Sequence, residues 1–159
     1  SDGGVRDAWC ALFDRYQVDL VLQGHNHVFE RTDPIRAGRP TREAGDRSTV
    51  DPESDGTVYY TVGSAGRPRY DFQPGEPEGY RGRELTDTLV PNSYAWAPDG
   101  SKHAEAVTWS RVRYRNYAFI RVDVRPGTFV SEMDVTAVDE YGREFDTVTY
   151  RRPVRAQAS

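Results

Sequence analysis

The sequence predicts one sheet-based domain of the α/β or α+β class that ends in an antiparallel meander. Two patterns indicate this fold class: a helix followed by a buried strand in residues 5–22, and three alternating segments in residues 117–152. The chain has 159 residues, of which 36% are hydrophobic. This is enough to bury a core of its own, so we expect a single domain.

The first expected element is an amphipathic helix over residues 5–16. Its apolar residues recur at the i, i+3, i+4 and i+7 spacing of one helix face. We expect this face to be buried and to place Trp9, Leu12 and Phe13 in the core. Cys10, next to Trp9, is expected to be a small buried residue.

Two short strands are expected next. Residues 18–22 are apolar and β-branched and stop at Gly24, which is typical of a buried strand that follows a helix. Residues 57–62 form a second such run, which ends at the glycine-rich turn 63–66. Between the strands, residues 31–56 are rich in Arg, Asp, Gly and Pro and lack periodicity, so we expect an exposed loop.

The remaining chain divides into an irregular segment and a meander. Residues 67–115 contain many Gly, Pro and aromatic residues, which predicts a long loop, with His103 in a surface turn. Residues 117–124, 129–137 and 144–152 alternate with period two and are separated by turn sequences. This pattern predicts a three-stranded antiparallel meander.

Composition excludes several classes of protein. Lys and Arg number 21 against 25 Asp and Glu, a net charge of −4, which argues against a nucleic-acid sleeve or a binder of anionic membranes. No apolar run reaches the length of a membrane span. The single cysteine excludes an intrachain disulfide and a Cys-rich zinc site. With only three histidines, any metal site made by this chain alone must be poor in imidazole.

One motif contains candidate metal ligands. It is Gly24-His25-Asn26-His27, directly after the first expected strand. Ligands of open α/β sheets bind outside the carboxyl ends of strands. We expect Gly24 to allow the sharp turn, and two imidazoles two residues apart can point at neighbouring positions. Neutral imidazole is a good ligand of zinc, iron and manganese, so the pair could supply one ligand to each of two adjacent metal ions.

Two other interpretations of this motif are less well supported by the sequence. A His-x-His sequence at a strand end is by itself most simply interpreted as part of an ordinary polar surface. Here the preceding strand and glycine and the following Phe-Glu-Arg favour a metal site instead. The His-x-His-x-Asp-His pattern of metallo-β-lactamase-like hydrolases fails, because Phe29 and Glu30 stand where Asp and His are needed.

Residues 18–31 resemble the last metal-binding block of the calcineurin-like metallophosphoesterases, and within them of the purple acid phosphatase group. In that group Gly-His-x-His is followed by an aromatic residue, Glu and Arg, as it is here. Residues 56–66, and Trp109-Ser110 with residues 113–124, are similar to later parts of the same group. The resemblance implies the C-terminal half of a metallophosphoesterase β-sandwich flanked by helices, which ends in the meander.

The resemblance also implies a function, a site and a location. His25 would bind the second, divalent ion of a dinuclear centre, and His27 the first, often ferric ion, so that iron is combined with zinc, manganese or a second iron. The substrate would be a phosphate ester. Independently of the resemblance, Asn26, Arg67 and Arg69 are candidate contacts of the phosphate, because an arginine near a metal-bound phosphate could bind its free oxygens with two hydrogen bonds. Ordinary solvated arginines are the simpler interpretation of Arg67 and Arg69. Related bacterial proteins are commonly exported, which implies an extracellular or cell-envelope location.

The chain departs from the family pattern in its ligand set. The Asp-x-His, Gly-Asp-x-x-Tyr/Asp and Gly-Asn-His-Glu/Asp blocks and a further histidine block are absent, and only His103 remains after His25 and His27. Residues 1–159 are therefore expected to be the C-terminal part of one catalytic domain, with two metal ligands, inactive alone, and completed by an N-terminal half that could be a separate chain. The alternative is an inactive fragment or a non-catalytic β-rich scaffold.

Ser64, Glu30 and Arg31 are expected to have roles other than catalysis. Ser64 follows a glycine but lacks the Gly-x-Ser-x-Gly context of a nucleophile and has no histidine nearby in the sequence. Glu30 and Arg31 are expected to form a structural ion pair beside the site.

Overall fold

The computed structural model describes residues 5–66, 68, 81–84, 92–96, 99–106, 108–114 and 116–154. Its helices are α1 (Val5–Arg15) and α2 (Pro52–Asp55). Its strands are β1 (Leu20–Gln23), β2 (Phe29–Thr32), β3 (Ile35–Arg36), β4 (Arg39–Pro40), β5 (Ser48–Val50), β6 (Val58–Val62), β7 (Arg81–Glu84), β8 (Asn92–Trp96), β9 (Lys102–Ala106), β10 (Ser110–Tyr114), β11 (Ala118–Arg125), β12 (Val130–Asp139) and β13 (Glu144–Pro153).

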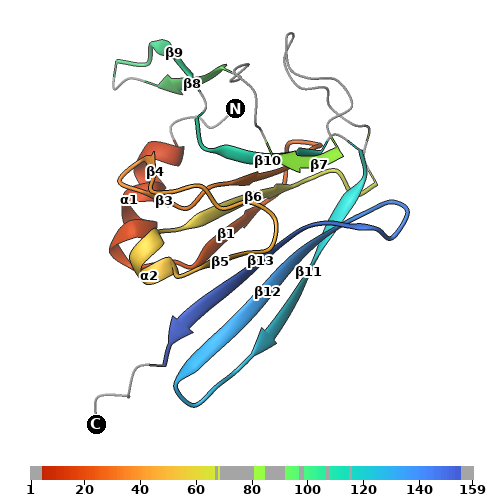
Figure 1. Ribbon diagram of the computed structural model, residues 1–159. Coiled ribbons are helices and arrows are strands. Elements are labelled where there is room, and N and C mark those ends of the chain that lie inside the picture. The colour runs from red at the N-terminus through yellow and green to blue at the C-terminus, as the bar shows by residue number, and fades with distance from the viewer. Residues whose placement is uncertain are drawn as a thin grey trace.

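Two mixed sheets form the body of the molecule (Figure 1). The first has the order β1-β6-β2-β10-β7, in which β1 and β6 are parallel and the other neighbours are antiparallel. The second has the order β11-β12-β13-β5, in which β5 runs parallel to β13. The described part of the chain is therefore β-rich with few helices, and the predicted meander is confirmed as β11, β12 and β13.

The hydrophobic core lies between these two sheets. Phe29 and Tyr60 from the first sheet and Val135 and Val148 from the second are all 0% exposed and belong to one cluster. Phe145 on β13 packs edge-on against Phe29, with ring centroids 5.1 Å apart. Apolar side chains from both sheets thus share one buried layer, which is the main source of stability in such an arrangement.

The predicted helix is confirmed, but its buried face is narrower than expected. Phe13 packs against Tyr59 of β6 with ring centroids 6.1 Å apart. Tyr59 points away from its neighbour Tyr60, which faces the core, so α1 covers the outer face of the first sheet. Trp9 is 55% and Leu12 48% exposed, and their assignment to the core was wrong.

The first strand also differs from its prediction. β1 forms as expected and pairs with β6, but the burial of its residues falls off along the strand. Leu20 packs against the core cluster, whereas Leu22 is 50% exposed. The prediction of a strand was right, and the prediction that it is buried was wrong for Leu22.

The expectation of an exposed loop over residues 31–56 was wrong. This segment contains the end of β2, three further short strands and α2, and Arg31, Asp33, Ala44 and Val50 are buried. The Asp33 carboxylate accepts hydrogen bonds from the Ala44 amide at 2.8 Å and from the Arg111 guanidinium at 2.9 and 2.7 Å. These polar contacts order a segment that has no periodic apolar face to pack against the core.

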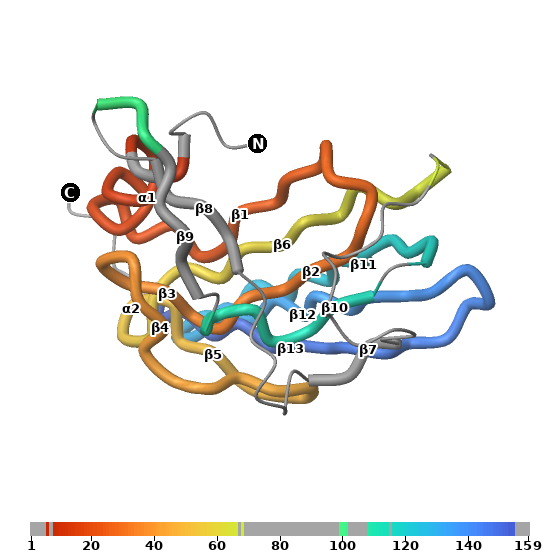
Figure 2. Tube along the Cα trace, turned by 90° about the horizontal axis from the view of Figure 1, so that it is seen from above, coloured from red at the N-terminus to blue at the C-terminus, as the bar shows by residue number. Residues whose placement is uncertain are grey.

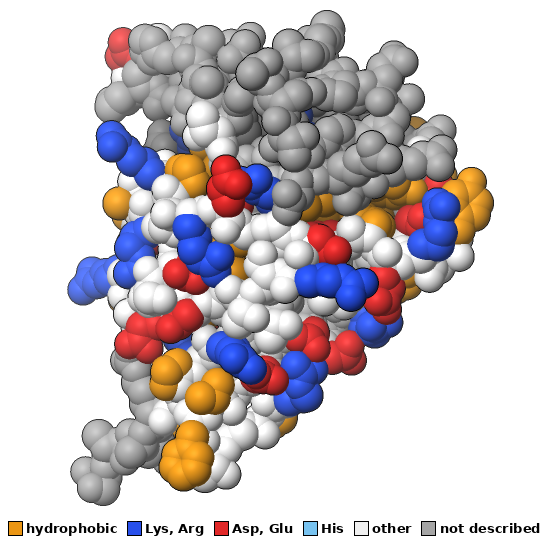
Figure 3. Space-filling view, viewed as in Figure 1, with side chains coloured by type: hydrophobic (Ala, Val, Ile, Leu, Met, Phe, Trp, Pro, Cys, Tyr) orange, Lys and Arg blue, Asp and Glu red, His pale blue; other side chains and the backbone are white. Residues whose placement is uncertain are grey.

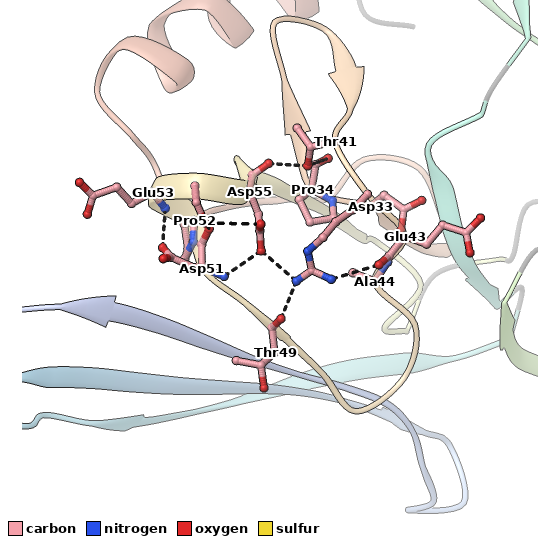
Figure 4. Close-up of polar contacts among 12 residues, drawn as sticks. Asp33, Pro34, Thr41, Glu43, Ala44, Thr49, Asp51, Pro52, Glu53 and Asp55 are labelled. Carbon is pink, nitrogen blue, oxygen red and sulfur yellow. Dashed lines mark hydrogen bonds and ion pairs between the residues drawn. The ribbon is translucent and has the colours of Figure 1, made fainter.

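A polar network around Asp55 fixes the turn that leads into α2 (Figure 4). Asp51 caps the helix by accepting from the Glu53 amide at 2.9 Å. The Asp55 carboxylate accepts from the Asp51 amide at 3.0 Å and from Arg42 at 2.8 Å. Arg42 also donates to the Thr49 carbonyl at 2.5 Å, so the network ties β5 to the short helix.

Three further expectations are corrected by the structure. Residues 67–115 include strands β7 to β10 and are therefore not one long loop. His103 lies in β9 opposite Ala95 of β8 and not in a turn. Glu30 and Arg31 do not pair with each other, because neighbouring residues of a strand point to opposite faces.

The outer face of the meander carries charges of both signs. Arg121 contacts Asp123 and Glu144 at 2.9 Å, and Arg125 contacts Asp134 at 2.5 Å. Figure 3 shows positive and negative side chains interleaved on the described surface that faces the viewer. Exposed pairs of this kind contribute little to stability, and they mark this face as a solvent face. Neither described helix is long and apolar enough to cross a membrane.

Candidate functional site

The candidate site is the loop of residues 24–28, at the carboxyl end of β1. Because β1 and β6 are parallel, this loop and the turn after β6 emerge at the same edge of the first sheet (Figure 2). The Gly63 amide donates to the Val28 carbonyl at 3.2 Å, and the Val28 amide donates to the Asn26 carbonyl at 2.9 Å. The two segments that sequence analysis placed after strands are therefore hydrogen-bonded to each other.

The sharp turn of the motif is made by His25 and not by Gly24. His25 has φ of 72°, in the left-handed region that non-glycine residues seldom adopt. Gly24 is absent from the residues with positive φ, and a Cβ added to it would meet no atom within 4 Å. The expectation that Gly24 supplies the turn was wrong, and the backbone strain lies on an exposed histidine.

Gly63 is the residue on which the loop rests. A Cβ at this position would stand 2.1 Å from the Asn26 carbonyl oxygen, so the backbones of the two segments approach more closely than any side chain would allow. The sequence motif drew attention to Gly24, whereas the requirement for glycine is at Gly63. The Gly63-Ser64-Ala65-Gly66 turn was the sequence signal that could have identified it.

His27 is partly buried and held by the backbone. Its Nδ1 lies 2.6 Å from the carbonyl oxygen of Pro68. A carbonyl oxygen only accepts hydrogen bonds, so Nδ1 carries the proton in this contact and Nε2 is the unprotonated nitrogen of the neutral ring. Sequence reasoning did not identify Pro68, because a backbone acceptor leaves no signature in residue type.

The other predicted site residues divide into two groups. Asn26 is exposed at the tip of the loop, between the two histidines. Arg67 and Arg69 lie outside the described residues. Within the described ranges, no group of three or more His, Cys, Asp or Glu side chains could hold a metal ion. The loop thus presents two histidines two residues apart.

Ser64 has a structural role. It is 0% exposed, and its Oγ accepts a hydrogen bond from the Ala118 amide at 3.2 Å. This contact joins the turn after β6 to the first residue of β11. An open depression of about 210 Å³ lies beside it, lined by Ala65, Tyr117, Ala118, Phe119, Asp139, Glu140 and Gly142. None of the predicted site residues lines this depression.

Buried polar side chains lie in the core on β2, β6 and β13. Arg31, two residues after Phe29, donates from Nε and Nη2 to the Asp146 carboxylate at 2.6 and 2.8 Å. Tyr60 and Tyr150 share a hydrogen bond of 2.8 Å between their hydroxyl groups. Burial raises the pKa of both tyrosines above the ordinary value, so they remain neutral hydrogen-bonding groups.

A second polar group lies on the other face of β2. The Ser110 hydroxyl donates to Glu30, and Arg113 Nε contacts Ser110 at 2.9 Å and Glu30 at 3.7 Å. Glu30 therefore pairs across to β10, and its contacts hold the strand that follows the histidine loop.

The two packed mixed sheets, with a histidine loop at the end of parallel strands, have a counterpart among solved structures, which supports a metallophosphoesterase-like fold. The chain is similar to a purple acid phosphatase isolated from yellow lupin (Lupinus luteus) seeds, with a TM-score of 0.53 and 17% sequence identity. The match covers 95% of this chain and 23% of that structure's chain. At this identity the likeness shows the fold alone.

Sequence comparison adds relatives without an assigned activity. Two uncharacterized proteins, from two strains of Mycobacterium tuberculosis, are each 42% identical to this chain over 71 residues. The match covers 42% of this chain and 13% of each relative, so the chain matches a small part of much longer proteins. No family model matches the chain.

Proposed function

We propose that this chain is the C-terminal part of a phosphoesterase of the purple acid phosphatase-like group, and that it supplies His25 and His27 to a dinuclear metal centre. The observation that carries the proposal is the loop after β1, where His27 is oriented by the Pro68 carbonyl two residues from His25. The fold of the yellow lupin enzyme supports the class of reaction.

The residues present fit a metal ion in one specific way. Histidines that bind metals generally donate their second ring N–H to a carbonyl, a carboxylate or water, which fixes the ring and the tautomer. His27 makes this contact through Nδ1, so Nε2 is the nitrogen that would bind the ion. When bound, two metal ions would polarise a phosphate ester and provide a nucleophile at neutral pH.

The chain's own residues have supporting roles in this proposal. Gly63 allows the turn after β6 to hold the loop, and His25 adopts the left-handed backbone conformation that makes the sharp turn between Gly24 and Asn26. Asn26, exposed between the histidines, offers an amide group to a phosphate oxygen. The substrate class is a phosphate monoester or diester.

This chain alone is expected to bind metal weakly and to hydrolyse phosphate esters slowly or not at all. Two imidazoles are fewer ligands than the three or four that catalytic metal sites usually take from protein. The complete domain therefore needs further ligands from polypeptide outside residues 1–159.

Metal content and phosphatase turnover test the proposal together. The complete assembly is expected to contain two metal ions and to hydrolyse p-nitrophenyl phosphate or its bis-ester, and both properties should be absent from the isolated chain. His25→Ala and His27→Ala should abolish activity and reduce metal content. His103→Ala, the same substitution at a histidine placed in β9, is the matched control and should change neither.

Two results would contradict the proposed function. Two tightly bound metal ions and turnover in the isolated chain would show that the ligand set is complete without a partner. An assembly that folds but contains no metal would favour a non-catalytic scaffold.

A further inference from the structure

The depression beside Ser64 combines aromatic and acidic walls. Its volume of about 210 Å³ lies below the roughly 300–1,000 Å³ of pockets for drug-sized ligands, so it suits a small group. Its lining residues come from the turn after β6, the start of β11 and the turn between β12 and β13, which lie at the same end of the molecule (Figure 2). The side chains of these three segments therefore determine the chemistry of a ligand.

Two aromatic rings form the wall at the start of β11. Tyr117 and Phe119 are 39% and 52% exposed, whereas Ala118 between them is 3% exposed. Because side chains of an extended chain alternate between two faces, both rings lie on the same face. The face of an aromatic ring attracts cations, and quaternary ammonium groups are typical ligands of several rings together.

The acidic wall carries one carboxylate without a positive partner among the described residues. The charge of Asp139 is balanced by Arg143 at 2.7 Å. Glu140 instead accepts a hydrogen bond from the Tyr114 hydroxyl at 2.7 Å, and no described Arg or Lys forms an ion pair with it. Burial raises the pKa of Tyr114 to about 12, so its hydroxyl is a neutral donor. The depression therefore has a net negative charge beside its two rings.

These walls favour an organic cation over other small groups. An anion would be repelled by the Glu140 carboxylate, and an uncharged apolar group would gain nothing from it. A bare metal ion needs more ligands, and within the described ranges no group of three or more His, Cys, Asp or Glu side chains could hold one. An alkylammonium group uses both the rings and the carboxylate.

The depression adjoins the histidine loop. Ala65, which lines it, lies two residues after Gly63, whose backbone rests on the Asn26 carbonyl. Two residues of extended chain span at most about 7 Å. The opposite wall is tied to the same turn, because the Ala118 amide donates to Ser64 Oγ at 3.2 Å. The far end of a short ligand bound in the depression can therefore reach toward the loop.

We propose that the depression binds an ammonium group on a short alkyl chain, such as that of choline, between Tyr117, Phe119 and Glu140. The molecule that carries this group is inferred from the proposed function, on which this step rests. In a phosphoesterase it is the amino-alcohol side of a phosphate ester, whose phosphate lies toward the histidine loop.

Titration of the full chain with choline tests the site, with the NMR amide signals of residues 117–119 and 140 as the readout. Choline is expected to bind with a dissociation constant on the order of millimolar, as contacts to two rings and one exposed charge allow. In the matched uncharged ligand a tert-butyl group replaces the trimethylammonium group. This ligand has the same shape and should bind about tenfold more weakly or worse.

Two substitutions separate the contributions of the ring and the charge. Phe119→Leu keeps an apolar side chain but removes the ring, and Glu140→Gln keeps an acceptor for Tyr114 but removes the charge. Each should weaken choline binding about threefold or more. Phe129→Leu is the matched control, since Phe129 is 83% exposed and does not line the depression. Phe119 and Glu140 are exposed, so both variants should keep the fold, which their NMR spectra check.

Three outcomes would overturn the proposal. One is the absence of any shift of these amide signals at choline concentrations far above millimolar. Another is equal binding of choline and its uncharged analogue, which would show an apolar depression without preference for charge. The third is unchanged choline binding by both Phe119→Leu and Glu140→Gln.

A metal-dependent measurement separates this inference from the proposed function. With Zn²⁺ present, phosphocholine should bind about threefold more tightly than choline or better, because its phosphate would reach the metal at the histidine loop. Removal of Zn²⁺ with EDTA should abolish this difference and leave choline binding unchanged. Equal binding of the two ligands with Zn²⁺ would overturn the assignment to a phosphate ester and leave a site for a free amino alcohol. Choline binding that needs Phe119 and Glu140 would stand even where no phosphatase activity is found.

Discussion

Arg31 on β2 and Asp146 on β13 form a two-pronged ion pair that joins the two sheets through the core. The guanidinium Nε and Nη2 lie 2.6 and 2.8 Å from the two carboxylate oxygens, and both side chains are at most 1% exposed. Burial alone would lower the pKa of Arg31, but the hydrogen bond and charge of Asp146 raise it above the ordinary value. A third contact, from Nη1 to the Ala44 carbonyl at 2.8 Å, fixes the segment between β4 and β5 to the same group.

Removal of the Asp146 charge should destabilise the protein strongly. Asp146→Asn keeps the shape of the side chain but leaves the Arg31 guanidinium without a buried counter-ion, which typically costs about 3–5 kcal/mol. Urea unfolding, followed by tryptophan fluorescence, measures the change. Glu144→Gln, on the same strand but in an exposed pair with Arg121, is the control and should leave the unfolding midpoint nearly unchanged. Equal effects of the two substitutions would contradict the structural role of the pair.

Gly63 and Gly24 should respond oppositely to the same substitution. Gly63→Ala places a Cβ 2.1 Å from the Asn26 carbonyl oxygen, so the loop must move, at a cost of about 1–3 kcal/mol. Gly24→Ala meets no atom within 4 Å and should change stability by less than about 0.5 kcal/mol. Thermal unfolding measures both. In the complete protein, only Gly63→Ala should also lower metal content. A larger effect at Gly24 would show that the motif glycine, and not Gly63, supports the loop.

The tautomer of His27 can be observed without a metal. Nitrogen NMR of the isolated chain at about pH 8, where free imidazole is neutral, should show the proton of His27 on Nδ1 because Pro68 accepts it. In water the Nε2-protonated form of imidazole is usually the more populated one, so His25, which is exposed, provides the internal comparison. A proton on Nε2 of His27 would remove the support that this contact gives to the metal site.

Asp139 should make the turn between β12 and β13 sensitive to acid. Burial would raise the pKa of Asp139, but hydrogen bonds from the Arg143 and Tyr141 amides and from the Arg143 guanidinium hold it below the ordinary value. A lowered folded-state pKa adds stability above the unfolded-state value of about 3.9, and this stability is lost as pH falls through the folded-state pKa.

The measurement is the urea midpoint between about pH 6 and about pH 3. The unsubstituted chain should lose stability toward the acid end, and Asp139→Asn should start less stable and lose less over this range, since its side chain does not titrate. Parallel curves for the two proteins would assign the acid sensitivity to other carboxylates.

Local patterns were sufficient for the elements whose partners are near in sequence. The meander followed from alternation and turn residues, and β1 and β6 followed from short apolar runs that end at glycines. The placement of the histidine loop at a strand end also followed, because it depends only on the residues that surround it. These parts of the fold required no knowledge of the second sheet.

The predictions that were wrong share one physical cause, which is that burial depends on contacts between residues far apart in the sequence. Residues 31–56 have no apolar period, because their order depends on partners such as Arg111 and Asp146. Arg31 and Asp146 are separated by 115 residues, and no local pattern can indicate that an arginine in a polar segment will be fully buried. Trp9 and Leu22 were predicted to be buried and are exposed. An apolar residue in a regular pattern is buried only where another layer of the structure covers it.

The parallel pairing of β5 with β13 has a consequence for synthesis on the ribosome. The Thr147 amide donates to Asp46 across 101 residues, and Ser48 to Val50 pair with residues of the final strand. Proteins are made from the amino end, so among the described strands β5 has no neighbour to pair with until residues 148–150 have left the exit tunnel. Until then Arg31 also lacks its counter-ion Asp146. The contacts between residues close in sequence are therefore not sufficient to complete the fold during synthesis.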